Sequence, residues 1–205
     1  GIFPPATAVE RIMPVRKILQ SAWLLVLSGL ACAPHPDDDL LVRAYQLGQQ
    51  YQWQDAMPLV RPYLLAHPDS AAAHYLWGSC HLHDSAPALE IAKGEFETAL
   101  ALFSQSHEVG PLKETLTPGQ FEAQIHQEAA LVYMRWVREA SLNNVAHSAI
   151  EIQINMALDH VRKARALTPE SKVLEDMETT LLQVGGLDTP AKSTDLPGNG
   201  PAPPA

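Results

Sequence analysis

Three copies of one spacing pattern constrain the fold of this chain more than any other feature of its sequence. Each copy is built around an alanine, with a large apolar residue three positions before it and a proline twelve positions after it. Between the alanine and the proline, the residues four and seven positions after the alanine complete the pattern. The copies are Trp53, Ala56, Val60, Tyr63 and Pro68; Phe96, Ala99, Phe103, Ser106 and Pro111; and Ile154, Ala157, Val161, Ala164 and Pro169. Spacings of three, four and seven place side chains on one stripe of an α-helix, and proline ends a helix. The pattern therefore predicts three amphipathic helices, each closed by a turn.

Each of these helices is predicted to pair with a helix that precedes it. The partner segments, at about residues 40–50, 71–80 and 121–140, carry apolar or small residues at helical spacing. Thr117-Pro118-Gly119-Gln120 predicts a helix start, because a threonine cap with glutamine three residues later forms a capping box. A last helix is predicted at about residues 170–183, with Thr168 as its cap and Pro169 at its first position. No further helix follows it to form a pair, and two glycines end it as a C-cap.

The composition agrees with an all-α domain and excludes one class of partner. The chain is 46% hydrophobic and 18% charged, which suits a globular protein with a core. Its formal charge is -9, and removal of residues 1–31 would leave -11. A nucleic-acid-binding surface needs clustered basic residues, so we expect no nucleic-acid partner.

The paired helices resemble the tetratricopeptide repeat, in which a small residue marks the first helix and an alanine the second. Tyr75-Leu76-Trp77-Gly78 and Gly94-Glu95-Phe96-Glu97-Thr98-Ala99 are the most specific fragments, and the resemblance covers about residues 40–184. It implies a short right-handed solenoid of about three helix-turn-helix pairs plus a C-terminal capping helix. The repeat alanines lie 43 and 58 positions apart, whereas the family repeat is about 34 residues. The later pairs should therefore contain insertions or longer helices. A generic helical bundle is the alternative.

A basic and apolar segment lies near the start of the chain. Arg16 and Lys17 precede an apolar run over residues 22–31, and Cys32 follows that run. A basic flank and an apolar run of about ten residues are typical of a signal peptide, whereas a membrane-spanning helix needs about 20 apolar residues. We therefore expect residues 1–31 to comprise upstream residues and a signal peptide.

The end of this run resembles the bacterial lipobox. Ser28-Gly29-Leu30-Ala31-Cys32 places small and aliphatic residues before a cysteine, with glycine where leucine is commonest. The resemblance implies a lipid on Cys32, cleavage before it and, because Ala33 follows, a place in the outer membrane facing the periplasm. Ordinary cleavage after Ala33 and a retained signal anchor are the alternatives. Residues 32–39 then form a tether, and the Pro- and Gly-rich residues 185–205 are expected to be a disordered tail.

A histidine-rich patch at residues 74–84 is the main candidate for chemistry. His74, His81 and His83 are weak metal-ligand candidates, with Cys80 and Asp84 beside them. No known zinc-ligand spacing appears, so helix-end histidines and a buried cysteine are the simpler interpretation. The chain has no catalytic or phosphate-binding motif, and we expect neither an enzyme nor a cofactor.

The resemblance implies a binding function. Tetratricopeptide arrays hold partners on a concave face, and the matching positions are Tyr45, Gln49, Tyr75, Ser79, Leu131 and Met134. Packing between helices is the alternative for each of them. We therefore expect a lipid-anchored protein–protein interaction scaffold or assembly factor of the bacterial cell envelope. The alternative function is a periplasmic small-ligand or metal-binding module that uses the patch at residues 74–84.

Overall fold

The computed structural model describes residues 37–143 and 145–186, which belong to one compact unit of the chain. The predicted signal peptide, Cys32, most of the tether and most of the tail lie outside the described residues. Every regular element in the described part is helical, so the prediction of an all-α protein is confirmed. None of these helices is both long and apolar enough to cross a membrane.

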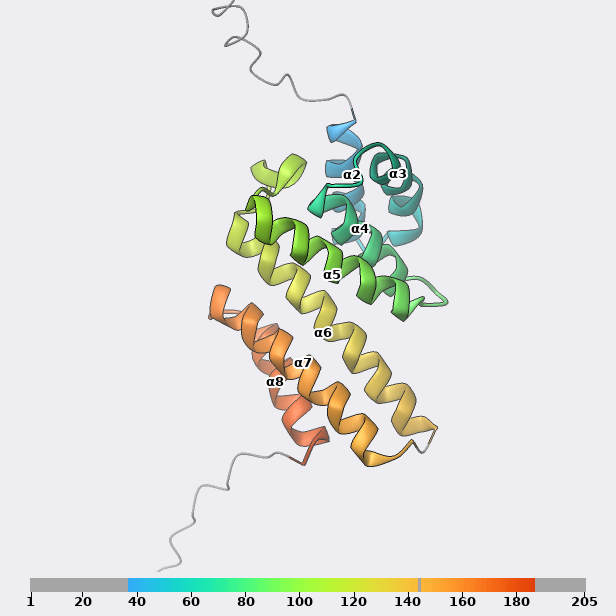
Figure 1. Ribbon diagram of the computed structural model, residues 1–205, viewed down its shortest axis with the longest axis vertical. Helices are drawn as coiled ribbons and strands as arrows, with labels where there is room; N and C mark the ends of the chain where they lie inside the picture. Colours follow the sequence, from blue (N-terminus) through green and yellow to red (C-terminus); the bar gives the residue numbers. More distant parts are fainter. Residues whose placement is uncertain (1–36, 144, 187–205) are drawn as a thin grey trace, which may run out of the picture. The chain divides into compact units, whose positions relative to one another are not determined.

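Seven α-helices and one short 3-10 helix make up the described residues (Figure 1). They are α2 (Asp38–Gln49), α3 (Trp53–Ala66), α4 (Ala71–Leu82), α5 (Leu89–Ser106), η1 (Gly110–Glu114), α6 (Pro118–Leu142), α7 (His147–Leu167) and α8 (Lys172–Val184). The tether therefore ends two residues earlier than predicted, because Asp38 and Asp39 form the acidic first turn of α2. Negative charge is favourable at a helix N-terminus.

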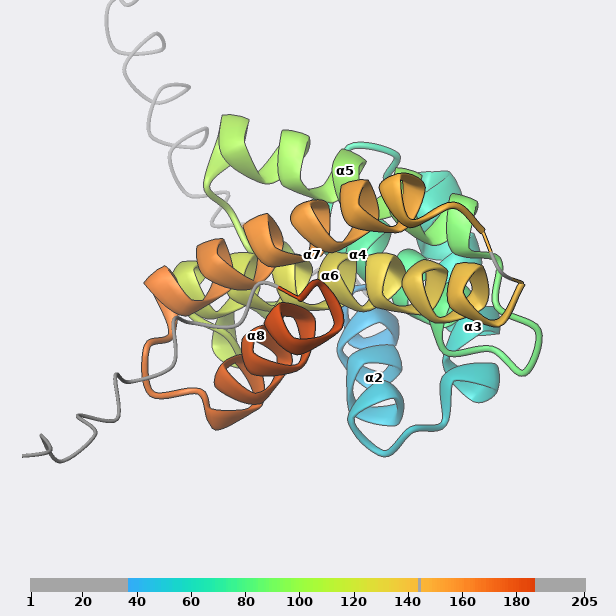
Figure 2. The same cartoon turned by 90° about the horizontal axis from the view of Figure 1, so that it is seen from below.

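Consecutive helices pack against each other along the whole series. α2 packs on α3, α4 on α5, α6 on α7, and α8 on α7. α2 also contacts α4, and α4 contacts α6, so the first helices of successive pairs touch. Figure 2 shows α5 and α7 on one side of α6, with α2 and α8 on the other. The helices are longer in the second half, at 25 residues for α6 and 21 for α7.

The repeated stripe predicted from the sequence lies in the core, except for Ser106, which is exposed at the end of α5. All of its alanines are fully buried, and the large apolar residue before each is at most 8% exposed. These residues are Ala56, Ala99 and Ala157, preceded by Trp53, Phe96 and Ile154. Pro68 and Pro169 lie in turns, and Pro111 lies in η1. The small alanine side chains let neighbouring helices approach closely, and burial of the larger residues stabilises that approach.

Local capping explains where several helices begin. The Thr117 hydroxyl accepts a hydrogen bond from the Gln120 N–H at 3.3 Å, and the Gln120 side chain accepts one from the Thr117 N–H at 2.9 Å. This is the predicted capping box at the start of α6. Ser70 caps α4 by accepting from the Ala73 N–H.

The predicted start of the last helix was wrong by one turn. Thr168 ends α7, where its hydroxyl donates to the Ala164 carbonyl, and the N-cap of α8 is Ser171. The threonine bonds to the preceding helix, so it is not available to cap the next one. At the other end of α8, Gly185 and Gly186 close the helix as predicted, and Gly186 has a positive φ of 62°.

α6 takes part in two separate hydrophobic cores. Phe121, Ile125 and Val132 belong to the first core, which α2–α5 and η1 complete. Tyr133 and Val137 belong to the second core, which α7 and α8 complete. The helix is therefore the shared wall between both halves of the described fold.

A comparison of two helical glycines tests the close packing of α4 against α5. A Cβ on Gly78 would lie 2.8 Å from Phe96 Cε1 and 3.2 Å from the Ala92 carbonyl oxygen, whereas a Cβ on Gly94 would meet nothing within 4 Å. We predict that Gly78→Ala lowers the free energy of unfolding by about 1–3 kcal/mol, because the buried ring must move. Gly94→Ala should raise it by about 0.5–1 kcal/mol, because alanine favours the helix. Urea unfolding measures both, and equal effects would contradict the close contact.

Candidate functional site

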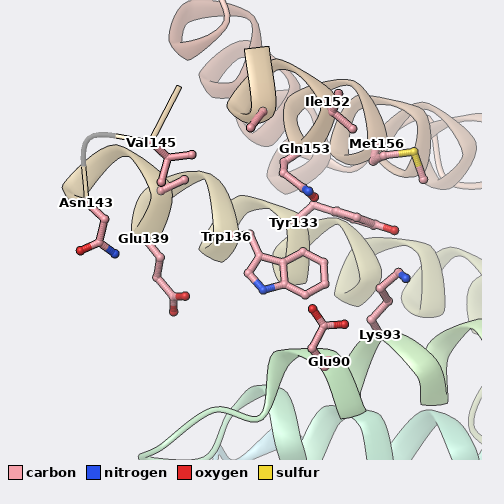
Figure 3. A pocket seen from close by; sticks show the side chains of 12 residues that line it. Glu90, Lys93, Tyr133, Trp136, Glu139, Asn143, Val145, Ile152, Gln153 and Met156 are labelled. Carbon is pink, nitrogen blue, oxygen red and sulfur yellow. The ribbon is translucent and has the colours of Figure 1, made fainter. Parts of the chain in front are cut away.

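A cleft of about 550 Å³ opens between α5, α6 and α7 (Figure 3). Its walls come from the first turns of α5, the C-terminal half of α6 and the first half of α7 with the residues before it. The lining residues are Glu90, Lys93, Tyr133, Trp136, Glu139, Ala140, Asn143, Val145, Ala149, Ile152, Gln153 and Met156. A concave, mixed apolar and polar surface of this kind is the usual form of a binding site.

Two aromatic side chains of α6 form the floor of the cleft. Tyr133 and Trp136 are three residues apart and so project from one face of the helix. Their ring centroids lie 5.4 Å apart at an interplanar angle of 68°. Tyr133 is 4% exposed, and Trp136 is half-buried, so the indole keeps part of its surface open to the cleft.

α7 adds an exposed apolar wall. Ile152 is 62% exposed and Met156 is 41% exposed, and their spacing of four places them on one face of the helix. Val145, just before α7, is 43% exposed. Part of each of these side chains remains exposed in the described fold, and a bound chain would remove that exposed surface from water.

A small number of polar side chains, from α5, α6 and α7, line the cleft beside its apolar residues. Glu90 and Lys93 rise from α5, and Lys93 pairs with Glu97 at 3.4 Å. Gln153 points from α7 toward Tyr133, and its buried Oε1 has no hydrogen-bond partner among the described residues. The Tyr133 hydroxyl is protonated at neutral pH and can donate, because the ordinary pKa of tyrosine is 10.0 and burial raises the pKa of Tyr133 further. The arrangement can bind an apolar chain and orient it through a small number of hydrogen bonds.

The residues predicted to bind a partner do not line this cleft. Tyr45, Tyr75 and Ser79 are buried at 6%, 2% and 0% exposure, so they pack between helices and present no open surface. Gln124 of α6 accepts from the Tyr75 hydroxyl at 3.2 Å and donates to that of Tyr45 at 3.1 Å. The Ser79 hydroxyl donates to the Tyr75 carbonyl at 3.0 Å. Gln49 is exposed near the end of α2, and Leu131 and Met134 are half-buried on α6.

The three histidines proposed as weak metal ligands point to separate partners. His74 lies 2.6 Å from Glu95 and 2.9 Å from the Pro68 carbonyl oxygen. His83 lies 2.8 Å from Glu128 and stacks on Trp53. His81 packs edge-on against Trp77.

Together these contacts leave the histidine-rich patch without a convergent ligand set. No group of three or more possible metal ligands occurs in the described part of the chain. Burial raises the pKa of the nearby Cys80 thiol to about 12, so this cysteine is a protonated core residue at neutral pH.

One wall of the cleft could have been predicted from the sequence, from apolar residues of α7 that lie outside the repeated stripe. Ile152 and Met156 do not belong to the buried stripe of α7, which contains Ile154, Ala157 and Val161. They form a second apolar stripe on the same helix. Single exposed apolar residues are common on protein surfaces, whereas neighbouring ones such as Ile152, Met156 and Val145 indicate an interaction surface.

A pair of histidines outside the histidine-rich patch joins α6 to α7. The Nδ1 atoms of His126 and His160 lie 2.9 Å apart, and His160 also stacks on Tyr133. Burial, followed by His160 and Lys163, lowers the pKa of His126 to about 4. Burial also lowers the pKa of His160, although the Asp159 and Glu97 carboxylates nearby oppose that effect. Both rings are therefore neutral at pH 7, and one donates a hydrogen bond to the other.

Comparison with protein-family models, curated proteins and solved structures finds no match for this chain. The candidate site therefore depends on the chain's own residues and their geometry.

The histidine pair predicts a loss of stability in mild acid. Because the pKa of His126 is lowered on folding, the unfolded chain binds more protons, and stability present above about pH 6.5 is lost as the pH falls toward 4. We expect wild-type protein to lose roughly 1–2 kcal/mol more than His126→Gln between pH 7 and pH 4.5. Glutamine keeps a hydrogen-bonding group but does not titrate. Urea unfolding at several pH values measures the difference, and parallel pH profiles would contradict the prediction.

Proposed function

We propose that this chain is a lipid-anchored protein–protein interaction scaffold of the bacterial cell envelope, built on a short tetratricopeptide-type helical array. The observation that carries the proposal is the cleft between α5, α6 and α7, with aromatic residues on its floor and exposed apolar residues along one wall. The anchor would be Cys32, and the array would face the periplasm from the outer membrane.

The packing order supports an array of helix pairs. Each predicted pair packs together, the first helices of neighbouring pairs touch, and the repeated alanine stripe is buried in all three second helices. The last helix, α8, packs on α7 without a following partner, as a capping helix would. These contacts agree with a solenoid and supply no feature that requires another architecture.

The surface of the cleft supports a protein partner. Ile152, Met156 and Val145 expose apolar area beside the partly open ring of Trp136. Contiguous exposed apolar surface with charged residues at its rim is typical of interaction sites. Glu90, Lys93 and Glu139 provide that rim and would select the register of the bound chain. The proposal assigns binding to this site and no catalysis.

Two surface substitutions test the role of the cleft in partner capture. Ile152→Ser should reduce capture from crosslinked cells about tenfold, because it removes an exposed apolar contact at an interface. Leu65→Ser is the matched control, since Leu65 is 77% exposed on α3 and does not line the cleft. Neither change should alter folding, which circular dichroism checks. Partners are identified by mass spectrometry, and equal capture by both variants would show that the cleft is not the binding site.

Substitution of each cysteine tests the anchor separately. Cys32→Ser should abolish incorporation of labelled palmitate and move the protein out of the membrane fraction, because the thiol is the acceptor of the lipid. Cys80→Ser should keep the label, since Cys80 is buried in the core. Retention of the label in Cys32→Ser, or no label in wild type, would contradict lipid attachment.

A further inference from the structure

We propose that the cleft between α5, α6 and α7 is also the docking site for this chain's own C-terminal segment, residues 187–205, through Pro201-Ala202-Pro203-Pro204. The inference shares the cleft with the proposed function and adds its regulation: an external partner must displace the segment. It needs no knowledge of that partner, so it is tested on the purified chain alone.

The first support is the chemistry of the cleft floor. Proline-rich segments in the polyproline II conformation bind grooves lined by aromatic side chains, because the rigid prolines pack on the rings and lose little entropy. Trp136 offers a partly open indole, and Tyr133 packs against it at a centroid distance of 5.4 Å. The Tyr133 hydroxyl is protonated at neutral pH, so it can donate to a backbone carbonyl of the bound segment.

The unpartnered amide of Gln153 provides a further polar contact. Its Oε1 is buried at the cleft and has no hydrogen-bond partner among the residues described. Proline lacks a backbone N–H, so in this segment the acceptor would be satisfied by Ala202. A buried acceptor without a partner is costly, and docking of the segment would remove that cost.

The second support is the sequence of the segment itself. Pro201-Ala202-Pro203-Pro204 has the P-x-x-P spacing, in which the first and last prolines lie on one side of a three-residue turn. Residues 187–200 contain two glycines, two separated prolines and several small or polar residues, a composition typical of linkers. The chain therefore carries both an aromatic cleft and a short motif of the chemistry that such clefts bind.

The distance from the end of α8 to the cleft is short enough for the C-terminal segment to span. Only residues 168–171 join α7 to α8, and Glu178 of α8 forms ion pairs with Arg162 and Arg165 of α7. The two helices therefore run antiparallel, and α8 ends about level with Met156, one of the cleft residues. A path halfway around α7, whose diameter with side chains is about 10–12 Å, is about 16–19 Å long. A random coil of 14 residues, the length of residues 187–200, has a root-mean-square span of about 20 Å. Tethering at that length gives an effective concentration in the millimolar range.

Paramagnetic broadening of the tryptophan indoles tests the contact in the full chain. A nitroxide is placed at Asn199→Cys in a Cys32→Ser background, where buried Cys80 does not react. The indole N–H signals of Trp136 and Trp53 are assigned with single Trp→Phe variants. Trp53 lies on α3, outside the cleft, and serves as the internal control.

We expect the label to broaden the Trp136 signal at least about twofold more than that of Trp53, because the tether keeps most of the segment bound. Replacing Pro201, Pro203 and Pro204 by alanine should remove the difference. Equal broadening of both indoles, or broadening that survives the proline substitutions, would overturn the proposal. Broadening of Trp136 that rises with protein concentration would also overturn it, because the segment would then come from a second copy.

The outcome separates this inference from the proposed function. Loss of partner capture in Ile152→Ser with no selective broadening of Trp136 would leave a cleft that binds only external partners. Selective broadening without any captured partner would leave a cleft that binds only its own C-terminal segment.

Discussion

The packing of α6 against helices on both of its sides is the contact on which the rest of the structure depends. Phe121 and Ile125 are fully buried against the helices that precede α6, and Tyr133 and Val137 are buried against those that follow. A single apolar stripe faces one direction only, so α6 needs apolar residues on more than one face. Loss of this helix would expose both cores at once, and its 25-residue length is what allows it to serve both.

Polar groups on α6 add direction to that apolar packing. Gln124 bonds the hydroxyls of Tyr45 and Tyr75, which come from α2 and α4, and His126 bonds His160 of α7. Apolar contact tolerates rotation and sliding of a helix, whereas a buried polar group is costly unless its bond is made. These bonds therefore favour one register of α6 against its neighbours. Tyrosines that the repeat resemblance placed on a binding face have this packing role instead.

The same helix connects stability to the proposed binding function. α5 and α7 both pack on α6. Trp136, in the C-terminal half of α6, lies in the cleft between these helices and keeps part of its surface exposed there. Ile152 and Met156 continue that open surface on α7 without contributing to the core. Since the cleft is formed by helices that are already held in two cores, it is preformed, and binding there would not require the fold to reorganise.

Sequence alone determined the helices, most of their buried stripes and a few of their ends. Ala56, Ala99 and Ala157 could be assigned to the core because helix periodicity is local, and Thr117 and Gln120 could be assigned to a cap because their bonds span three residues. Tertiary structure decided the partners of each side chain. His74 and His83 are nine positions apart in sequence but pair with carboxylates on α5 and α6, and the cleft joins residues from Glu90 to Met156. Such contacts depend on how three helices cross, and periodicity within one helix carries no information about that crossing.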